Sequence, residues 1–396
     1  MQKLLVLGFS TRGLAEAVAK SKEGSSYELL TLDYFGDYDQ NQWGQSYSLW
    51  RDFGQASFSA QALATSATKL SYDTLAYTSG LDDEPDLVAE LTTGRELLGN
   101  DSSTLRRVRD WEQLHRFLET NRFAYPRTLY QWQGPVPSGR WLLKPRKSGG
   151  GTNINWAAEE VHLSEDYLLQ EYRASMPASV SFVANGQKAY VLGISEQLCG
   201  SRDFGASEFI YSGNIVPLWL DRWSEFPIGL WTWLKKLINL VTVEFGLKGL
   251  NGIDFLLTAD DEPMFLEVNP RYSASMELFA AAYGYDLFSL HVKACQGFGV
   301  EQAVLPAICQ RQGYWGKAVV YAPWDLSCGD TGGWFRAGIR DIPHPGEKIS
   351  AHSPICTVLA RGDTREECME ALREQQYWVL AQVIPSNRKG GGPGEG

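Results

Sequence analysis

Residues 249–275, GLNGIDFLLTADDEPMFLEVNPRYSAS, constrain the fold more than any other stretch of this chain. The run from Gly252 to Thr258 is rich in Ile, Phe and Leu, and the run from Met264 to Asn269 alternates hydrophobic and polar residues. Ala259 to Pro263, between them, has the composition of a turn. The pattern predicts a β-hairpin, and Pro270 ends its second strand because proline cannot donate to a strand ladder.

The expected register of this hairpin brings acidic side chains together. If Thr258 pairs with Pro263 across a four-residue loop, Asp254 lies opposite Glu267, and Asn269 shares the face of Glu267. Like charges directly opposite each other destabilise a sheet. We therefore predict that these two carboxylates and the amide hold a hard cation that keeps some waters, such as Mg²⁺. The competing interpretation is an ordinary hairpin with its acids in water.

A glycine-rich loop lies more than one hundred residues earlier. The apolar run from Trp141 to Leu143 leads to Lys144, and residues 145–152, PRKSGGGT, follow. Successive glycines cost backbone entropy and let a loop approach a ligand closely. Such a loop suits phosphate oxygens, which its N–H groups bind while the lysine supplies a point charge. A flexible linker is the alternative, but a linker does not need apolar strands on both sides. Arg271 is a further candidate for binding an anion near the metal.

Composition restricts the class of protein. Hydrophobic residues make up 44% and charged residues 21%, as in soluble globular proteins. The net charge of −11 argues against a nucleic-acid surface. Neither a signal peptide nor an apolar run of membrane-spanning length is visible, so we expect a cytoplasmic protein with no membrane partner. The six cysteines lack zinc-binding spacing and are expected to be reduced, buried thiols.

The N-terminal part has the pattern of a doubly wound parallel sheet. Apolar strands are predicted at 3–9 and 27–33, with a helix at 14–20 between them. Gly8 and Gly13 are spaced G-x-x-x-x-G with no Lys-Ser/Thr after them, so neither a dinucleotide fingerprint nor a P-loop is present. An NAD oxidoreductase is therefore disfavoured. The loops at 8–13 and 33–40 follow strand ends, where doubly wound sheets bind ligands, and are candidates for contacting a substrate.

We predict three domains and a tail: a Rossmann-like domain at 1–103, a nucleotide-binding domain at 104–300, a small α+β section at 301–385 and a disordered tail at 386–396. Asp110 is expected to cap a helix over 111–121, and Asn185-Gly186 to join a hairpin. Further helices are predicted at 229–245, 276–295 and 364–381.

The order of these parts resembles the ATP-grasp superfamily. The nearest resemblance is to predicted ATP-dependent carboligases related to biotin carboxylase. It is carried by DYFGDYD at 33–39, KPRKSGGGTNI at 144–154, LNGIDFLL at 250–257 and LEVNPRYSASMEL at 266–278. The resemblance implies an α/β (α+β) fold: the doubly wound domain, a two-subdomain ATP-grasp core and a closing section like that of biotin carboxylases.

The resemblance implies ATP as cofactor, held by two groups of residues. Lys144 would contact the phosphates, under a lid formed by Gly149, Gly150, Gly151 and Thr152. The adenine would lie against a hinge whose backbone hydrogen bonds read the base edge, formed by Gln170, Glu171 and Tyr172.

The resemblance also implies that Asp254, Glu267 and Asn269 bind Mg²⁺, with Mn²⁺ as a substitute, and that Arg271 stabilises an acyl phosphate. Two departures stand out. Most relatives carry a ribose-binding Glu after the hinge, whereas residues 174–179 contain no acid. Biotin carboxylases follow the arginine with a bicarbonate-handling Val-Glu-His type segment, where this chain has residues 272–275, YSAS.

These features favour a carboxylate–amine ligase that works through an acyl phosphate, with a small-molecule acid and amine as partners. The resemblance to this group implies biosynthesis of a one-carbon carrier of the tetrahydromethanopterin or methanofuran type. The alternatives are a bicarbonate-using ATP-dependent carboxylase and a non-catalytic nucleotide-binding protein. Related folds are often dimers, so a homodimer is included among the expectations.

Overall fold

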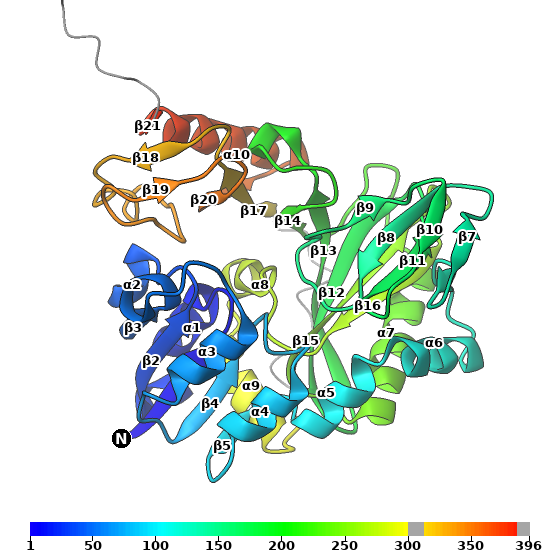
Figure 1. Ribbon diagram of the computed structural model, residues 1–396, viewed down its shortest axis with the longest axis horizontal. Coiled ribbons are helices and arrows are strands. Elements are labelled where there is room, and N and C mark those ends of the chain that lie inside the picture. Colours follow the sequence, from blue (N-terminus) through cyan, green and yellow to red (C-terminus); the bar gives the residue numbers. More distant parts are fainter. Residues whose placement is uncertain (300–312, 386–396) are drawn as a thin grey trace, which may run out of the picture.

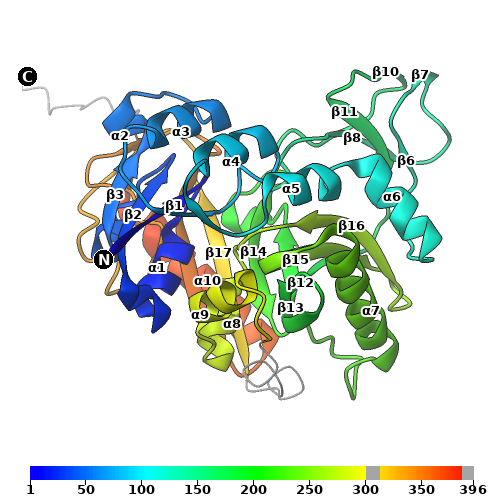
Figure 2. The same ribbon diagram turned by 90° about the horizontal axis from the view of Figure 1, so that it is seen from below.

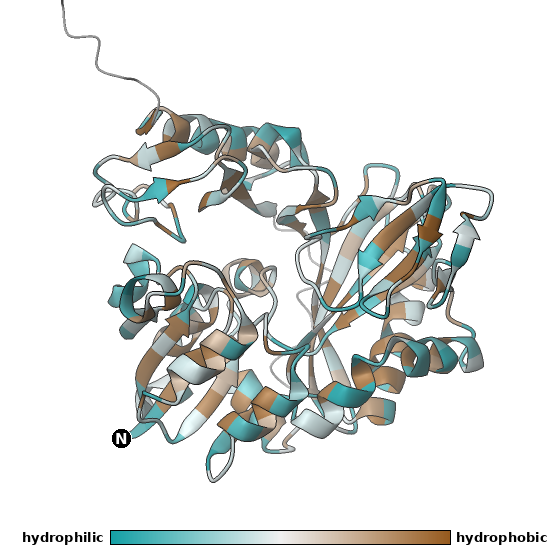
Figure 3. Cartoon of the chain, viewed as in Figure 1, coloured by the Kyte–Doolittle hydropathy of each residue, from teal (hydrophilic) through white to brown (hydrophobic). Residues whose placement is uncertain are grey.

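The computed structural model describes residues 1–299 and 313–385. It contains a parallel sheet at the N-terminus, a small antiparallel sheet, and a seven-stranded antiparallel sheet that connects the two (Figure 1). Hydrophobic residues are concentrated along the strands and on one side of the helices (Figure 3). In this part of the chain, no helix combines the length and the apolar character needed to cross a bilayer.

The N-terminal sheet has five parallel strands in the order β3-β2-β1-β4-β5. Leu4 and Val6 of its central strand face one hydrophobic cluster and Leu5 and Leu7 face another, so the strand is buried on both faces. The predicted doubly wound arrangement is confirmed. Its strands are β1 (Gln2–Leu7), β2 (Tyr27–Asp33), β3 (Gln45–Ser48), β4 (Thr74–Tyr77) and β5 (Glu96–Leu98). Its helices are α1 (Arg12–Lys20), α2 (Leu49–Phe53), α3 (Ala60–Ala67) and α4 (Pro85–Leu91).

Two helices lead into the small sheet. They are α5 (Ser102–Val108) and α6 (Trp111–Thr120), and the Asp110 carboxylate caps α6 by accepting from the Gln113 N–H at 3.0 Å, as predicted. The small sheet has the order β6-β11-β8-β9, formed by β6 (Thr128–Leu129), β11 (Tyr167–Glu171), β8 (Trp141–Pro145) and β9 (Asn155–Trp156). A separate pair joins β7 (Gln133–Pro135) to β10 (Glu160–His162).

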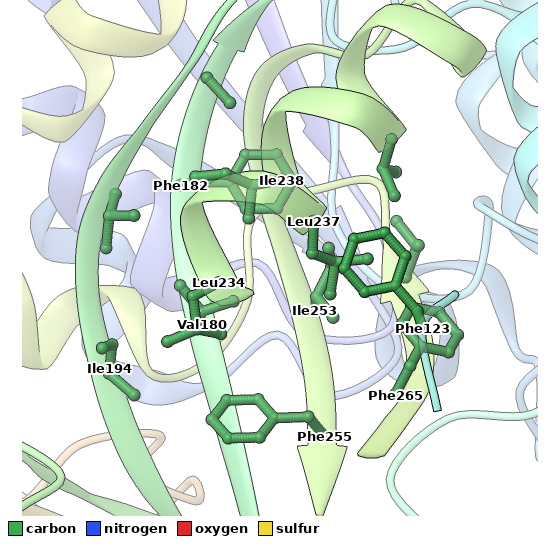
Figure 4. Packing of buried hydrophobic residues seen from close by; sticks show 14 of the residues in the cluster. Phe123, Val180, Phe182, Ile194, Leu234, Leu237, Ile238, Ile253, Phe255 and Phe265 are labelled. Carbon is green, nitrogen blue, oxygen red and sulfur yellow. The ribbon is translucent and has the colours of Figure 1, made fainter. Parts of the chain in front are cut away.

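The large sheet has the order β16-β15-β12-β13-β14-β17-β20. Its strands are β12 (Met176–Asn185), β13 (Ala189–Cys199), β14 (Tyr211–Val216), β15 (Lys248–Leu257), β16 (Pro263–Asn269), β17 (Tyr314–Tyr321) and β20 (Pro354–Gly362). Helix α7 (Ile228–Phe245) covers one face, where Leu234 and Ile238 pack against Val180, Phe182 and Ile253 (Figure 4). The predicted hairpin through Asn185-Gly186 joins β12 to β13.

The predicted helix over 276–295 is wrong as a single helix. It is two helices, α8 (Met276–Tyr283) and α9 (Leu287–Cys295). Gly284 separates them with φ of +71°, a left-handed conformation that ends α8. Helix α9 shares a hydrophobic cluster with Leu4 and Val6 of β1 and with Val183 and Leu250 of the large sheet. It thereby joins the N-terminal sheet to the large one (Figure 2).

The C-terminal part continues the large sheet, because β17 pairs with β14 and β20 pairs with β17. It adds a small sheet of β18 (Leu326–Cys328), β19 (Lys348–Ile349) and β21 (Val383–Pro385), and the helix α10 (Arg365–Leu380). Thr364 and Glu367 form a capping box at the start of α10. The predicted disordered tail and residues 301–312 of the third section lie outside the described residues.

The cysteines agree in part with the sequence analysis. Five are free thiols, of which Cys328, Cys356 and Cys368 are buried. Cys199 was predicted to be buried but is exposed, because it ends β13 at a bulge in its pairing with β14. Cys309 lies outside the described residues.

Candidate active site

The hairpin of β15 and β16 has the predicted pairing at its acidic positions. Asp254 lies opposite Glu267, and Gly252 lies opposite Asn269. The predicted pairing of Thr258 with Pro263 is wrong, since Pro263 pairs with Leu257. A bulge at Leu266 adds one residue to β16 and restores the register at Glu267.

Asp254 is held by two amides. Gln197 Nε2 donates to Asp254 Oδ1 at 2.8 Å, and Asn269 Nδ2 donates to Oδ2 at 3.0 Å. Burial and the neighbouring Glu267 raise the pKa of Asp254 to about 7. Two carboxylates that lie opposite each other favour a cation bound between them.

Lys144 links the two sheets at this point. Its Nζ lies 3.3 Å from Glu267 Oε2 and 5.0 Å from the centre of the Trp111 ring, and the side chain is buried. Burial alone would raise the pKa of Glu267, but Lys144 and then Arg109 outweigh it and hold that pKa below its usual value. The small sheet thus delivers a buried cation to the carboxylate pair of the large sheet.

Arg271 lies beside the same group. Its Nη2 donates to Asn269 Oδ1 at 3.1 Å, and its Nε donates to Asp82 Oδ2 at 3.2 Å. The structure therefore brings together five predicted site residues: Lys144, Asp254, Glu267, Asn269 and Arg271.

The side chains of Asp254, Glu267 and Asn269 have the chemistry that a hard divalent cation prefers. Two carboxylates and one amide suit an ion that keeps several waters. The Asn269 amide donates its NH₂ to Asp254 and accepts from Arg271, so its oxygen reaches a cation beside Asp254 only after the amide turns over. Among residues 1–299 and 313–385, no group of three His, Cys, Asp or Glu side chains is arranged to hold a metal, consistent with only two carboxylates in this set.

The glycine-rich loop lies against the start of β14. The Gly150 carbonyl accepts from the Tyr211 N–H at 2.9 Å. Gly151 has φ of +78°, and a Cβ there would lie 1.9 Å from the Phe209 carbonyl oxygen, so only glycine fits. The loop thus bridges the small and large sheets, whereas Thr152 is exposed.

The predicted hinge residues lie at the end of β11. Gln170 is buried and donates through Nε2 to Thr128 Oγ1 at 3.1 Å. The N–H groups of Glu171 and Tyr172 already donate to the carbonyls of Arg127 and Arg140. Any contact of these two residues with a base would therefore use their carbonyl groups or side chains.

Sequence reasoning missed several neighbours of the site. Gln197 was detectable only as one of three consecutive polar residues, Ser195 to Gln197, near the end of β13. Asp82 and Asp83 were detectable as acids just after a parallel strand. The 2.6 Å hydrogen bond from Arg109 to Asp83 had no signal in the sequence.

Comparison with known proteins decides the family of this region. Residues 108–275 match a family model described as ATP-grasp domain. This part of the chain is an ATP-grasp domain. It contains the Lys144 strand, the glycine-rich loop and the hairpin of Asp254 and Glu267. In a comparison with curated proteins, none matches the chain.

Solved structures share the ATP-grasp fold across nearly the whole chain. A biotin carboxylase from Campylobacter jejuni, solved as a beta-gamma-ATP complex, has a TM-score of 0.69 and 11% identity over 97% of this chain and 92% of its own. N5-carboxyaminoimidazole ribonucleotide synthetase from Thermotoga maritima has a TM-score of 0.64 and 13% identity, covering 98% and 100%. An L-amino acid ligase from Bacillus licheniformis has a TM-score of 0.65 and 13% identity, also covering 98% and 100%. At these identities the likeness shows the fold alone.

Proposed function

We propose that this protein is an ATP- and Mg²⁺-dependent ligase that joins a carboxylate to an amine through an acyl phosphate. One observation carries the proposal: Lys144 Nζ lies 3.3 Å from the carboxylate of Glu267, which lies opposite Asp254. Lys144 can bind phosphate oxygens, and the pair of Asp254 and Glu267 can bind a metal. These residues lie together where the small sheet meets the large sheet. Phosphoryl transfer asks a protein mainly for such positioning and charge neutralisation.

In this proposal Lys144 binds the ATP phosphates and residues 149–152 cover them, with residues 170–172 beside the adenine. Asp254, Glu267 and Asn269 would hold Mg²⁺, which when bound supplies positive charge to the phosphate oxygens. This arrangement leaves the reacting phosphate close to Arg271.

The proposed reaction has two steps. An oxygen of the substrate carboxylate attacks the γ-phosphorus, and ADP leaves. The amine nitrogen then attacks the acyl carbon, the bond to the phosphate oxygen breaks, and the nitrogen loses a proton. Arg271 stabilises the negative charge of the acyl phosphate.

The residues after Arg271 favour ligation over carboxylation. Tyr272 is buried, and its hydroxyl packs against Gly13. Ser273 and Ser275 have their Oγ atoms 3.4 Å apart, so this stretch presents no acid or base for bicarbonate. The ligase and carboxylase structures named above share the fold, which is compatible with either reaction. A role in building a one-carbon carrier, by a glutamyl-type ligation, is supported by the sequence resemblance alone.

The test is ADP release measured against a matrix of carboxylates and amines, with bicarbonate as one acid and glutamate as another. We expect ADP release that requires both an acid and an amine. Bicarbonate-stimulated release without an amine would identify a carboxylase. Binding of MgATP with no release under any pair would identify a non-catalytic nucleotide-binding protein.

A further inference from the structure

A cavity at the start of α6 is lined by residues that the reaction described above does not use as ligands. Its volume is about 390 Å³. Its lining comes from the loop after β4, from α6 and the residues just before it, and from the start of the glycine-rich loop. The lining residues are Asp83, Arg109, Asp110, Trp111, Glu112, Arg116, Arg146 and Lys147. Four cationic and three acidic side chains line it, so the lining has a small net positive charge in a protein whose net charge is −11. Local cations of this kind attract anions against the field of the whole protein.

Two of the four cations are neutralised by neighbouring acids. Arg109 donates to Asp83 at 2.6 Å, and Lys147 Nζ lies 2.9 Å from Glu84. Both pairs lie in the part of the cavity formed by the loop after β4.

The other two cations, Arg116 and Arg146, contact carbonyl oxygens. Arg116 Nε donates to the Glu112 carbonyl at 3.2 Å, and Arg146 donates to the carbonyls of Tyr130 and Tyr167 at 3.0 and 3.3 Å. Within the described ranges, neither guanidinium lies within 4.0 Å of a carboxylate. Their charges are therefore available to a ligand, and a guanidinium matches the geometry of phosphate and carboxylate oxygens.

The cavity adjoins the candidate active site. Trp111 lines it and donates from Nε1 to the Arg146 carbonyl at 3.0 Å, while Lys144 Nζ lies 5.0 Å from the centre of the same indole ring. Arg146 also follows Lys144 by two residues. The Trp111 ring thus contacts both the cavity and Lys144, the lysine assigned to the ATP phosphates.

We propose that this cavity is an oxyanion subsite in which Arg116 and Arg146 are the ligands. The subsite deepens the proposed function and rests on it for the identity of the anion. Two sources share the required chemistry: a phosphate of the nucleotide, and a separate oxyanion such as the released phosphate.

The test is isothermal titration calorimetry of wild type, Arg116→Gln and Arg146→Gln with MgATP, with MgADP, and with inorganic phosphate in the presence and absence of MgADP. We expect each variant to weaken one of these affinities about tenfold, the loss typical of a charged hydrogen bond. Weaker nucleotide binding identifies a nucleotide phosphate, and weaker phosphate binding alone identifies a separate oxyanion. Arg116 is exposed, so its variant is expected to fold even if Arg146→Gln does not.

The matched control is Arg373→Gln, which removes an exposed arginine of α10 that pairs with Asp203. The subsite is rejected if both cavity variants stay within twofold of wild type and of this control in all titrations, or if wild type binds neither phosphate nor nucleotide. If wild type binds no MgATP but binds inorganic phosphate through Arg116 and Arg146, the proposed function fails while the subsite stands.

Discussion

Glu267→Gln is expected to reduce ADP formation by more than about 10²-fold, the scale of losing one preorganised charge contact in an active site. Glutamine keeps the shape of the side chain, so the change removes charge alone. It deprives the proposed metal of one carboxylate and Lys144 of its 3.3 Å partner. It also removes the charge that helps to raise the pKa of Asp254, so that pKa is expected to fall.

ADP formation and MgATP affinity are both measured for this variant. Glu262→Gln is the matched control, because it removes the same charge from the exposed turn of the same hairpin. We expect the control to retain wild-type turnover. Turnover of Glu267→Gln within tenfold of wild type would remove Glu267 from the metal site.

Arg12→Met is expected to lower the free energy of unfolding by about 3–5 kcal/mol, because it removes the cation that Glu277 and Asp341 share and leaves only Lys317 beside Glu277. Arg12 is 1% exposed at the start of α1. Its guanidinium donates to Asp341 at 2.8 and 3.1 Å and to Glu277 at 2.5 and 3.1 Å. The contacts join helix α1 of the N-terminal domain, helix α8 and the C-terminal part.

The pH dependence of this effect follows from the same contacts. Burial alone would raise the pKa values of Glu277 and Asp341, but Arg12 and then Lys317 outweigh it and hold both pKa values below their usual range. Acids with a lowered pKa in the folded state stabilise the protein above the unfolded pKa of about 4 and lose that contribution as the pH falls. The difference in free energy of unfolding between wild type and Arg12→Met is therefore largest at pH 7 and becomes smaller below about pH 4.

Urea unfolding at pH 7 and at pH 3.5 measures both effects. Arg106→Met is the control, since it breaks the exposed ion pair between Arg106 and Asp86, outside the network. Exposed pairs contribute about 1 kcal/mol or less. A loss for Arg12→Met no larger than that of the control would show that the network does not hold the three parts together.

Local pattern was sufficient to predict the hairpin that organises the site. Alternation along β16 and the turn at 259–263 placed Asp254 opposite Glu267, although the bulge at Leu266 was not foreseen. A bulge depends on how the strand packs against its neighbours, and the residues 263–269 show no Gly or other local mark of it. The break at Gly284 carried a signal, because glycine is the usual residue after the last turn of a helix.

Contacts between distant segments could not be read from the sequence. The loop at 33–40, which is expected to contact a substrate, also packs on the C-terminal part. The Tyr38 N–H donates to the Ile342 carbonyl at 2.7 Å, and Asp39 accepts from the Ile342 N–H at 2.9 Å. The partners lie about three hundred residues apart, and their meeting depends on β17 and β20 joining the large sheet. The contact of Gln197 with Asp254 likewise depends on the strand order, because β12 lies between β13 and β15 in the large sheet.

The central claim is that the substrate acid is activated as an acyl phosphate. It is tested most directly with an acid labelled with ¹⁸O in its carboxylate, incubated with MgATP and the amine that together support ADP release. The phosphate produced is then examined by ³¹P NMR. The account predicts one ¹⁸O in each phosphate, because the carboxylate oxygen that attacks the γ-phosphorus leaves with it. Phosphate without ¹⁸O would contradict the account.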